Sequence, residues 1–106
     1  MMVEEQDRKD AVLLAMSDPY MRRILASTML YDKSIEEIAR EKEIPLSSCY
    51  RRARALVALR LLRIERTIIT DTGKKYETYR SAFSDAKISM SSGQLAVEVT
   101  VNPRVQ

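Results

Sequence analysis

The chain has 106 residues, 45% of them apolar and 31% charged, which is the composition of one globular domain rather than of a disordered polymer. No apolar run approaches the roughly 20 residues that span a bilayer, and the acidic start, Met1 to Asp10, lacks the layout of a signal peptide. The single cysteine excludes an internal disulfide. We therefore expect a cytoplasmic protein that has no membrane partner.

Two amphipathic segments in the first 30 residues predict two helices. The first helix ends near Ser17, and its apolar face holds Val12, Leu13 and Met16. Asp18-Pro19 predicts the start of the second, because Asp18 supplies a capping oxygen and Pro19 already has a helical φ angle. The second helix is expected to continue to about Leu30.

Two further helices follow, and the second of them is rich in arginine. Ser34 and Glu37 have the spacing of a capping box, which predicts the start of a third helix. Pro45 opens the fourth helix, expected over residues 45–60. Net charge is only +3, yet residues 44–66 hold Arg51, Arg52, Arg54, Arg60, Arg63 and Arg66 against a single acid, Glu65. This stripe indicates a polyanionic partner, the alternative being a solvated helix face.

After the fourth helix the apolar period changes from 3.6 to 2, which predicts a β-hairpin over residues 63–82 with a turn at residues 70–73. Arg66 falls on its otherwise apolar face and is expected to pair with an acid, the alternative being a contact with DNA. A second hairpin is expected within residues 84–106, turning at Ser92-Gly93. One register places apolar residues opposite each other on one face and opposite charges opposite each other on the other face. It pairs Met90 with Leu95, Ile88 with Val97, Ala86 with Val99 and Lys87 with Glu98. Residues 1–83 would form the main domain and residues 84–106 an extension packed on it.

The third and fourth helices together have the pattern of a helix-turn-helix, in which the outer face of the second helix enters the DNA major groove. Cys49, Ala53 and Leu56 form one apolar seam at helical spacing, so Cys49 is interpreted as a buried apolar side chain rather than a redox switch. At 100° per residue, Ser47, Arg51, Arg54 and Ala58 point away from that seam, with Ser48 and Tyr50 beside them. The hairpin adds Lys74 and Lys75 near its tip, where a wing would touch the DNA backbone.

Two segments, LLAMSDPYMRRIL and SIEEIAREKEIPLSSCYRRARALVALRLL, together with the hairpin ERTIITDTGKKYETYRS, resemble ArsR-type winged-helix regulators, especially small archaeal ones. The resemblance implies an α+β, mostly α fold of four helices and a β-hairpin wing, and a homodimer that binds palindromic double-stranded DNA. It also implies a groove-facing set of Leu46, Ser47, Tyr50, Arg51 and Arg54, and a main dimer contact through the first helix, with Val12, Leu13 and Met16. The apolar face of the second hairpin covers either its own helices or a dimer partner, and we expect it to assist the dimer contact. Arg60 replaces a common helix-ending glycine, and Lys42-Glu43 replace an apolar residue and a turn glycine.

Other function classes find little support. There is no histidine, glycine-rich phosphate loop or nucleophile beside a base, so we expect neither enzymatic activity nor a cofactor. Without histidine and with one cysteine, a thiolate or imidazole metal site in one protomer is excluded. The expected function is a sequence-specific DNA-binding regulator whose effector is not identified. The alternatives are a winged-helix module that docks on another protein and a nonspecific architectural DNA protein.

Overall fold

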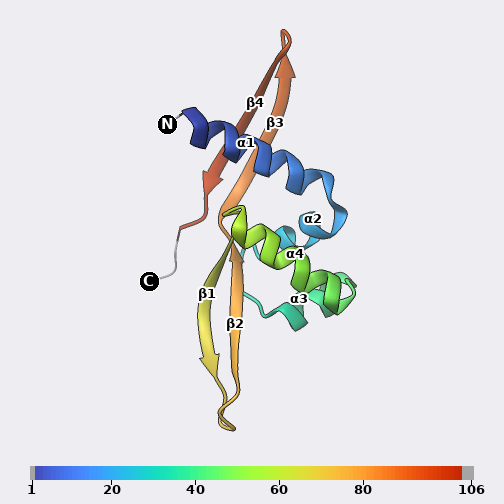
Figure 1. The fold of residues 1–106 in the computed structure, drawn as a ribbon, viewed down its shortest axis with the longest axis vertical. Helices are drawn as coiled ribbons and strands as arrows, with labels where there is room; N and C mark the ends of the chain where they lie inside the picture. The colour runs from blue at the N-terminus through green and yellow to red at the C-terminus, as the bar shows by residue number, and fades with distance from the viewer. Residues whose placement is uncertain (1, 104–106) are drawn as a thin grey trace.

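The structure is a computed structural model that describes the backbone of residues 2–103 and the side chains of residues 7–103. In this part the chain is α+β, with four helices followed by two antiparallel hairpins (Figure 1). The elements are α1 (Met2–Ser17), α2 (Pro19–Ser27), α3 (Ile35–Lys42), α4 (Leu46–Ala58), β1 (Leu62–Ile69), β2 (Lys75–Ser81), β3 (Phe83–Ser91) and β4 (Gln94–Val101). The hairpins extend in opposite directions from the helices along the longest dimension, 57 Å.

Both predicted helix caps are confirmed. The Oδ1 atom of Asp18 accepts hydrogen bonds from the backbone N–H groups of Tyr20 and Met21, at 2.9 and 3.0 Å. The Ser34 hydroxyl accepts from the Glu37 N–H at 3.2 Å, and the Glu37 carboxylate accepts from the Ser34 N–H at 3.0 Å. Each cap occupies N–H groups that a helix leaves without a partner, which explains why α2 and α3 begin where they do.

The expected extension of the second helix to Leu30 is wrong, because α2 ends at Ser27. The Thr28 hydroxyl donates to the Ile24 carbonyl at 2.9 Å, and the Thr28 carbonyl accepts from the Ser81 N–H at 3.0 Å. The backbone therefore leaves the helix to bind the sheet. Tertiary contacts decide this boundary against a local pattern that favoured three more helical residues.

The fourth helix ends at Ala58, two residues before the predicted limit, through a left-handed Arg60 with φ of 64°. The Leu61 N–H donates to the Leu56 carbonyl at 3.0 Å, as in a Schellman motif. Glu43 ends α3 with φ of 55°. Both non-glycine residues adopt the backbone conformation that a glycine would supply, so the absence of these glycines does not remove the turns.

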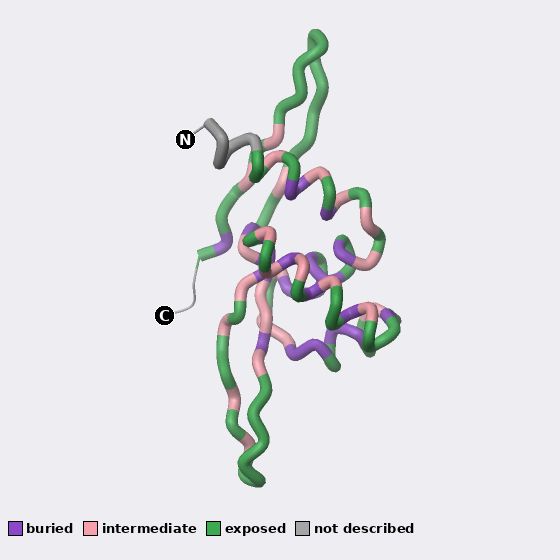
Figure 2. Tube along the Cα trace, in the orientation of Figure 1, coloured by how far each residue is buried: buried purple, intermediate pink, exposed green. Residues whose placement is uncertain are grey.

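The hydrophobic core lies where the four helices meet the bases of the two hairpins (Figure 2). It contains all three residues of the predicted α4 seam, Cys49, Ala53 and Leu56. The core residues are Ala11, Val12, Ala15, Met21, Ile24, Leu25, Ile35, Ile38, Ala39, Ile44, Cys49, Ala53, Leu56, Leu61, Leu62 and Phe83. None of the described helices is long and apolar enough to cross a membrane.

The first hairpin, β1–β2, has the expected turn but not a continuous alternation. A bulge at Glu65 shifts the register with β2 between Ile64 and Arg66, so the predicted period-2 pattern breaks there. Residue Lys33, in the loop before α3, also pairs with Tyr79 of β2 through N–H to carbonyl bonds of 3.0 and 2.7 Å. This additional pairing attaches the hairpin to the helices, and the sequence did not indicate it.

The second hairpin, β3–β4, has the predicted register at all four pairs. Ser92 and Gly93 both have positive φ, 53° and 75°, as a two-residue turn requires. Only its lower half is covered: Ala86, Val97 and Val99 pack on the core, whereas Met90 is 71% exposed. Figure 2 shows the exposed half extending beyond α1.

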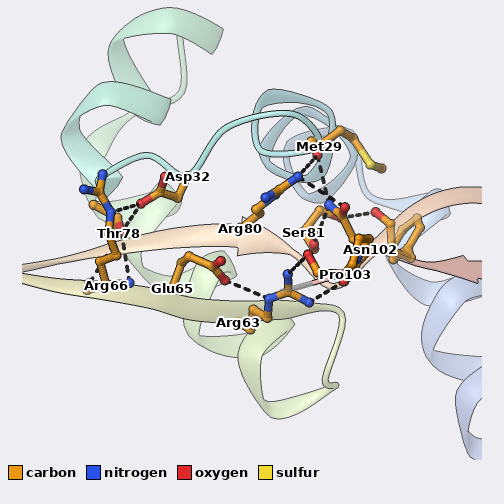
Figure 3. Close-up of polar contacts among 11 residues, drawn as sticks. Met29, Asp32, Arg63, Glu65, Arg66, Thr78, Arg80, Ser81, Asn102 and Pro103 are labelled. Carbon is orange, nitrogen blue, oxygen red and sulfur yellow. Dashed lines mark hydrogen bonds and ion pairs between the residues drawn. The ribbon is translucent and has the colours of Figure 1, made fainter. Parts of the chain in front are cut away.

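A polar network attaches the base of this hairpin to the domain (Figure 3). The buried Asn102 amide donates to the carbonyls of Met29 and Ser81 at 2.9 and 3.1 Å, and its oxygen accepts from Arg80 Nη2 at 3.2 Å. Arg63 donates to the carbonyl of Asn102 at 2.7 Å and to that of Pro103 at 2.9 Å. These bonds join β1 and β2 to the residues that follow α2 and β4, so the hairpin base belongs to the same folded unit as the helices.

Candidate nucleic-acid interface

The outer face of α4 presents the side chains that the sequence placed there. Arg51, Arg54 and Ser47 are exposed, Leu46 and Tyr50 are 48% and 41% exposed, and Ser48 is half-buried. Neither arginine forms an ion pair within the described part of the chain. The helix therefore offers two unneutralised guanidinium groups beside small and polar side chains.

The opposite face of α4 explains why the helix is rigidly placed. Cys49, Ala53 and Leu56 are buried, and the Cys49 thiol lies 3.8 Å from the carbonyl of Ile35 at the start of α3. Burial raises the pKa of Cys49 to about 11, so the thiol stays protonated and behaves as a small apolar group. This result agrees with the structural interpretation of Cys49.

Arg52 differs from its two neighbours, because it turns back onto α2. Its Nε atom lies 3.1 Å from both carboxylate oxygens of Asp18, and its guanidinium lies 4.9 Å from the centre of the Tyr20 ring. Burial alone would raise the pKa of Asp18, but the hydrogen bonds from Met21 and Arg52 outweigh it and lower the pKa. Arg52 thus fixes α4 against α2 and is not available to a ligand.

The start of α4 lacks a side-chain cap, because Pro45 occupies the capping position, and no acidic residue lies in its first turn. The N–H groups of this turn carry the partial positive charge of a helix start. Together with Ser47 and Ser48 they provide hydrogen-bond donors of the kind that contact phosphates.

The β1–β2 hairpin is held at its base and exposed at its tip. Arg66 Nε and the Thr78 hydroxyl both donate to Asp32 Oδ2, at 2.6 and 2.5 Å (Figure 3). The prediction that Arg66 pairs with an acid is confirmed. Lys74 and Lys75 are exposed beside the turn, in which Gly73 has φ of 83°.

A cleft of about 380 Å³ separates α3 and α4 from β2. Tyr50 of α4 and Lys75 of β2, both predicted site residues, line this one cleft and are thereby brought together. The local pattern of β2 does not show which of its side chains meet α4, so only the folded arrangement identifies the cleft. Its other lining residues, which the sequence reasoning missed, are Ile35, Glu36, Tyr76, Glu77 and Tyr79.

The predicted dimer residues divide between core and surface. Val12 is fully buried in the core of its own protomer, and Leu13 and Met16 are half-buried. The adjacent Leu14, which the prediction omitted, is 54% exposed. Any contact through α1 would therefore involve Leu14 rather than Val12.

No family model, curated protein or solved structure matches this chain. In the described part of the chain, no group of three or more histidine, cysteine, aspartate or glutamate residues is arranged to hold a metal ion.

Proposed function

We propose that the chain is a winged helix-turn-helix regulator that binds double-stranded DNA in a sequence-specific manner. α4 would enter the major groove, and the β1–β2 wing would contact the adjacent backbone. The order of four helices and a hairpin supports this proposal, as does the pairing of Lys33 with β2, which adds a short third strand to the wing.

One observation carries the proposal: the arginines of the basic stripe are used in two different ways. Arg52, Arg63 and Arg66 are paired with Asp18, Glu65 and Asp32, respectively. Arg51 and Arg54 share the exposed face of α4 and have no ion pair in the described residues. A helix face that only contacts solvent has no need to keep some arginines unpaired while others form ion pairs. A helix that reads a DNA groove requires free guanidinium groups for phosphates and guanine edges.

Selection from a random duplex library tests whether the binding is sequence-specific. Wild-type protein should enrich a defined motif, and a dimer should enrich two half-sites spaced by about one helical turn, roughly 34–36 Å. Enrichment without a motif would indicate nonspecific architectural binding. Failure to retain any duplex at low salt would reject DNA binding and leave the protein-docking alternative.

We further propose that the DNA-binding form is a homodimer. The apolar side chains left exposed on α1 and the upper half of β3–β4 support this proposal, because a lone two-stranded hairpin gains little stability in water. They include Leu14, 54% exposed, Ile88, 43% exposed, and Met90, 71% exposed. Leu14→Asp and Met90→Asp should each preserve the fold while shifting sedimentation from dimer to monomer. A monomeric wild type at micromolar concentration would reject the dimeric mechanism.

A further inference from the structure

The cleft between α3, α4 and β2 combines aromatic rings with carboxylates. Tyr50 and Lys75 are shared with the proposed DNA contacts, whereas the carboxylates and the other two tyrosines are not. Three tyrosines, Tyr50, Tyr76 and Tyr79, line its walls together with Glu36 and Glu77. Tyr50 and Tyr76 are 41% and 39% exposed, so their rings are open to a ligand. A space of about 380 Å³ accommodates a small organic molecule.

The charges that line the cleft favour a cation. Glu36 and Glu77 have no ion-pair partner in the described residues, and Lys75 is the one basic residue of the lining. Two carboxylates and one ammonium leave the lining with a net charge of −1. Arg54 does not line the cleft, although its charge reaches Tyr50 and Tyr79 and partly opposes the carboxylates.

Two of the tyrosines, Tyr50 and Tyr79, remain neutral hydroxyl groups in this setting. Burial, followed by the charge of Glu36 and a hydrogen bond with it, raises the pKa of Tyr50. Burial and the charge of Glu77 raise the pKa of Tyr79, whose hydroxyl lies 3.4 Å from the Glu77 carboxylate. The rings therefore keep electron-rich faces and add hydroxyl oxygens to the two carboxylates.

These features discriminate between classes of ligand. A phosphate would meet two carboxylates, and a hydrated divalent cation would take carboxylate oxygens but make no use of the three aromatic side chains. An organic ammonium ion meets both requirements of the cleft, since aromatic faces attract it and carboxylates accept its N–H groups. We propose that this cleft binds an organic ammonium ion of the alkylamine class. The proposal goes beyond the proposed function and does not depend on DNA binding.

The test is a titration of the DNA-free protein with spermidine, followed by calorimetry and by the NMR signals of the tyrosine rings. One molecule should bind, and the rings of Tyr50, Tyr76 and Tyr79 should shift while that of Tyr31 does not. Glu36→Gln/Glu77→Gln should weaken binding about 10-fold or more, because two charge-assisted contacts are lost. Glu43→Gln/Glu98→Gln, which removes the same charge elsewhere, should have little effect.

Three further variants separate a built site from general attraction to acidic surface. Arg54→Ala should strengthen spermidine binding, because a like charge near the tyrosines is removed. Tyr76→Leu should weaken it, while Tyr76→Phe retains the ring face and the affinity. Equal loss in the Glu43/Glu98 control, displacement by Mg²⁺ at equal concentration, or unmoved tyrosine signals would each overturn the proposal.

Discussion

Replacing Asn102 with alanine should markedly destabilise the protein, because one buried amide joins three segments that are distant in the sequence. Asn102 is 4% exposed, and its side chain makes hydrogen bonds to the Met29 carbonyl, the Ser81 carbonyl and Arg80 Nη2. The backbone bonds of residue 102, to Ala82 and Arg63, do not depend on the side chain and should persist.

The magnitude follows from what the truncation leaves behind. The Ser81 carbonyl would lose a fully buried bond of 3.1 Å, and an unsatisfied buried acceptor costs about 1–3 kcal/mol. The other two bonds are partly buried and contribute about 0.5–1.5 kcal/mol each. Met29 retains Arg80 Nη2 at 3.4 Å, which reduces the loss there. A net cost of about 2–4 kcal/mol is expected, a large fraction of the roughly 5–15 kcal/mol by which such domains are stable.

Urea denaturation followed by circular dichroism measures this change as a shift of the unfolding midpoint at constant slope. Gln94→Ala is the matched control, because Gln94 is an exposed polar residue of β4, the strand that leads into Asn102. It should change the unfolding free energy by less than about 0.5 kcal/mol. If Asn102→Ala is as stable as this control, the network does not attach the hairpin to the domain.

Three other predictions concern single side chains. Burial alone would raise the pKa of Asp32, but bonds from Thr78 and Arg66 lower it below the unfolded value of 3.8. The contribution of Asp32 to stability is therefore present above pH 3.8 and lost as pH falls through the folded pKa. Urea titrations at decreasing pH should show a smaller loss of unfolding free energy in Asp32→Asn than in wild type or in the exposed-site control Asp71→Asn. Cys49, with its pKa raised to about 11, should resist Ellman's reagent until the protein unfolds, and rapid reaction of the folded protein would contradict its burial. Arg60→Gly should stabilise the fold by up to about 1 kcal/mol, because a left-handed L-residue is strained, whereas Arg60→Val should destabilise it in the same urea assay.

The sequence predicted those features that depend on local chemistry. The caps at Asp18 and Ser34 follow from side-chain oxygens that reach neighbouring N–H groups, and the β3–β4 register follows from a two-residue turn with matched faces. The exposure of Arg51 and Arg54 follows from helical spacing alone. These elements need no information about distant parts of the chain.

Features that depend on tertiary contacts were not predictable in this way. α2 stops at Ser27 because Thr28 bonds to Ser81, which is distant in the sequence. The bulge at Glu65 in β1 interrupts a pattern that alternates in the sequence. Asn102 gave no signal, because nothing local shows that its amide will be buried. The aromatic cleft likewise requires the packing of β2 against α3 and α4.

The most direct test of DNA reading by α4 is a fluorescence-anisotropy titration of the selected duplex with wild type and Arg51→Ala/Arg54→Ala. Arg22→Ala/Arg23→Ala, which removes two exposed arginines of α2, is the control for charge. Arg51 and Arg54 are each expected to contribute about 1–3 kcal/mol, so the α4 variant should lose at least about 30-fold in affinity for the selected duplex and much less for a shuffled one. Equal affinity of the α4 variant and the control for the selected duplex would contradict the account.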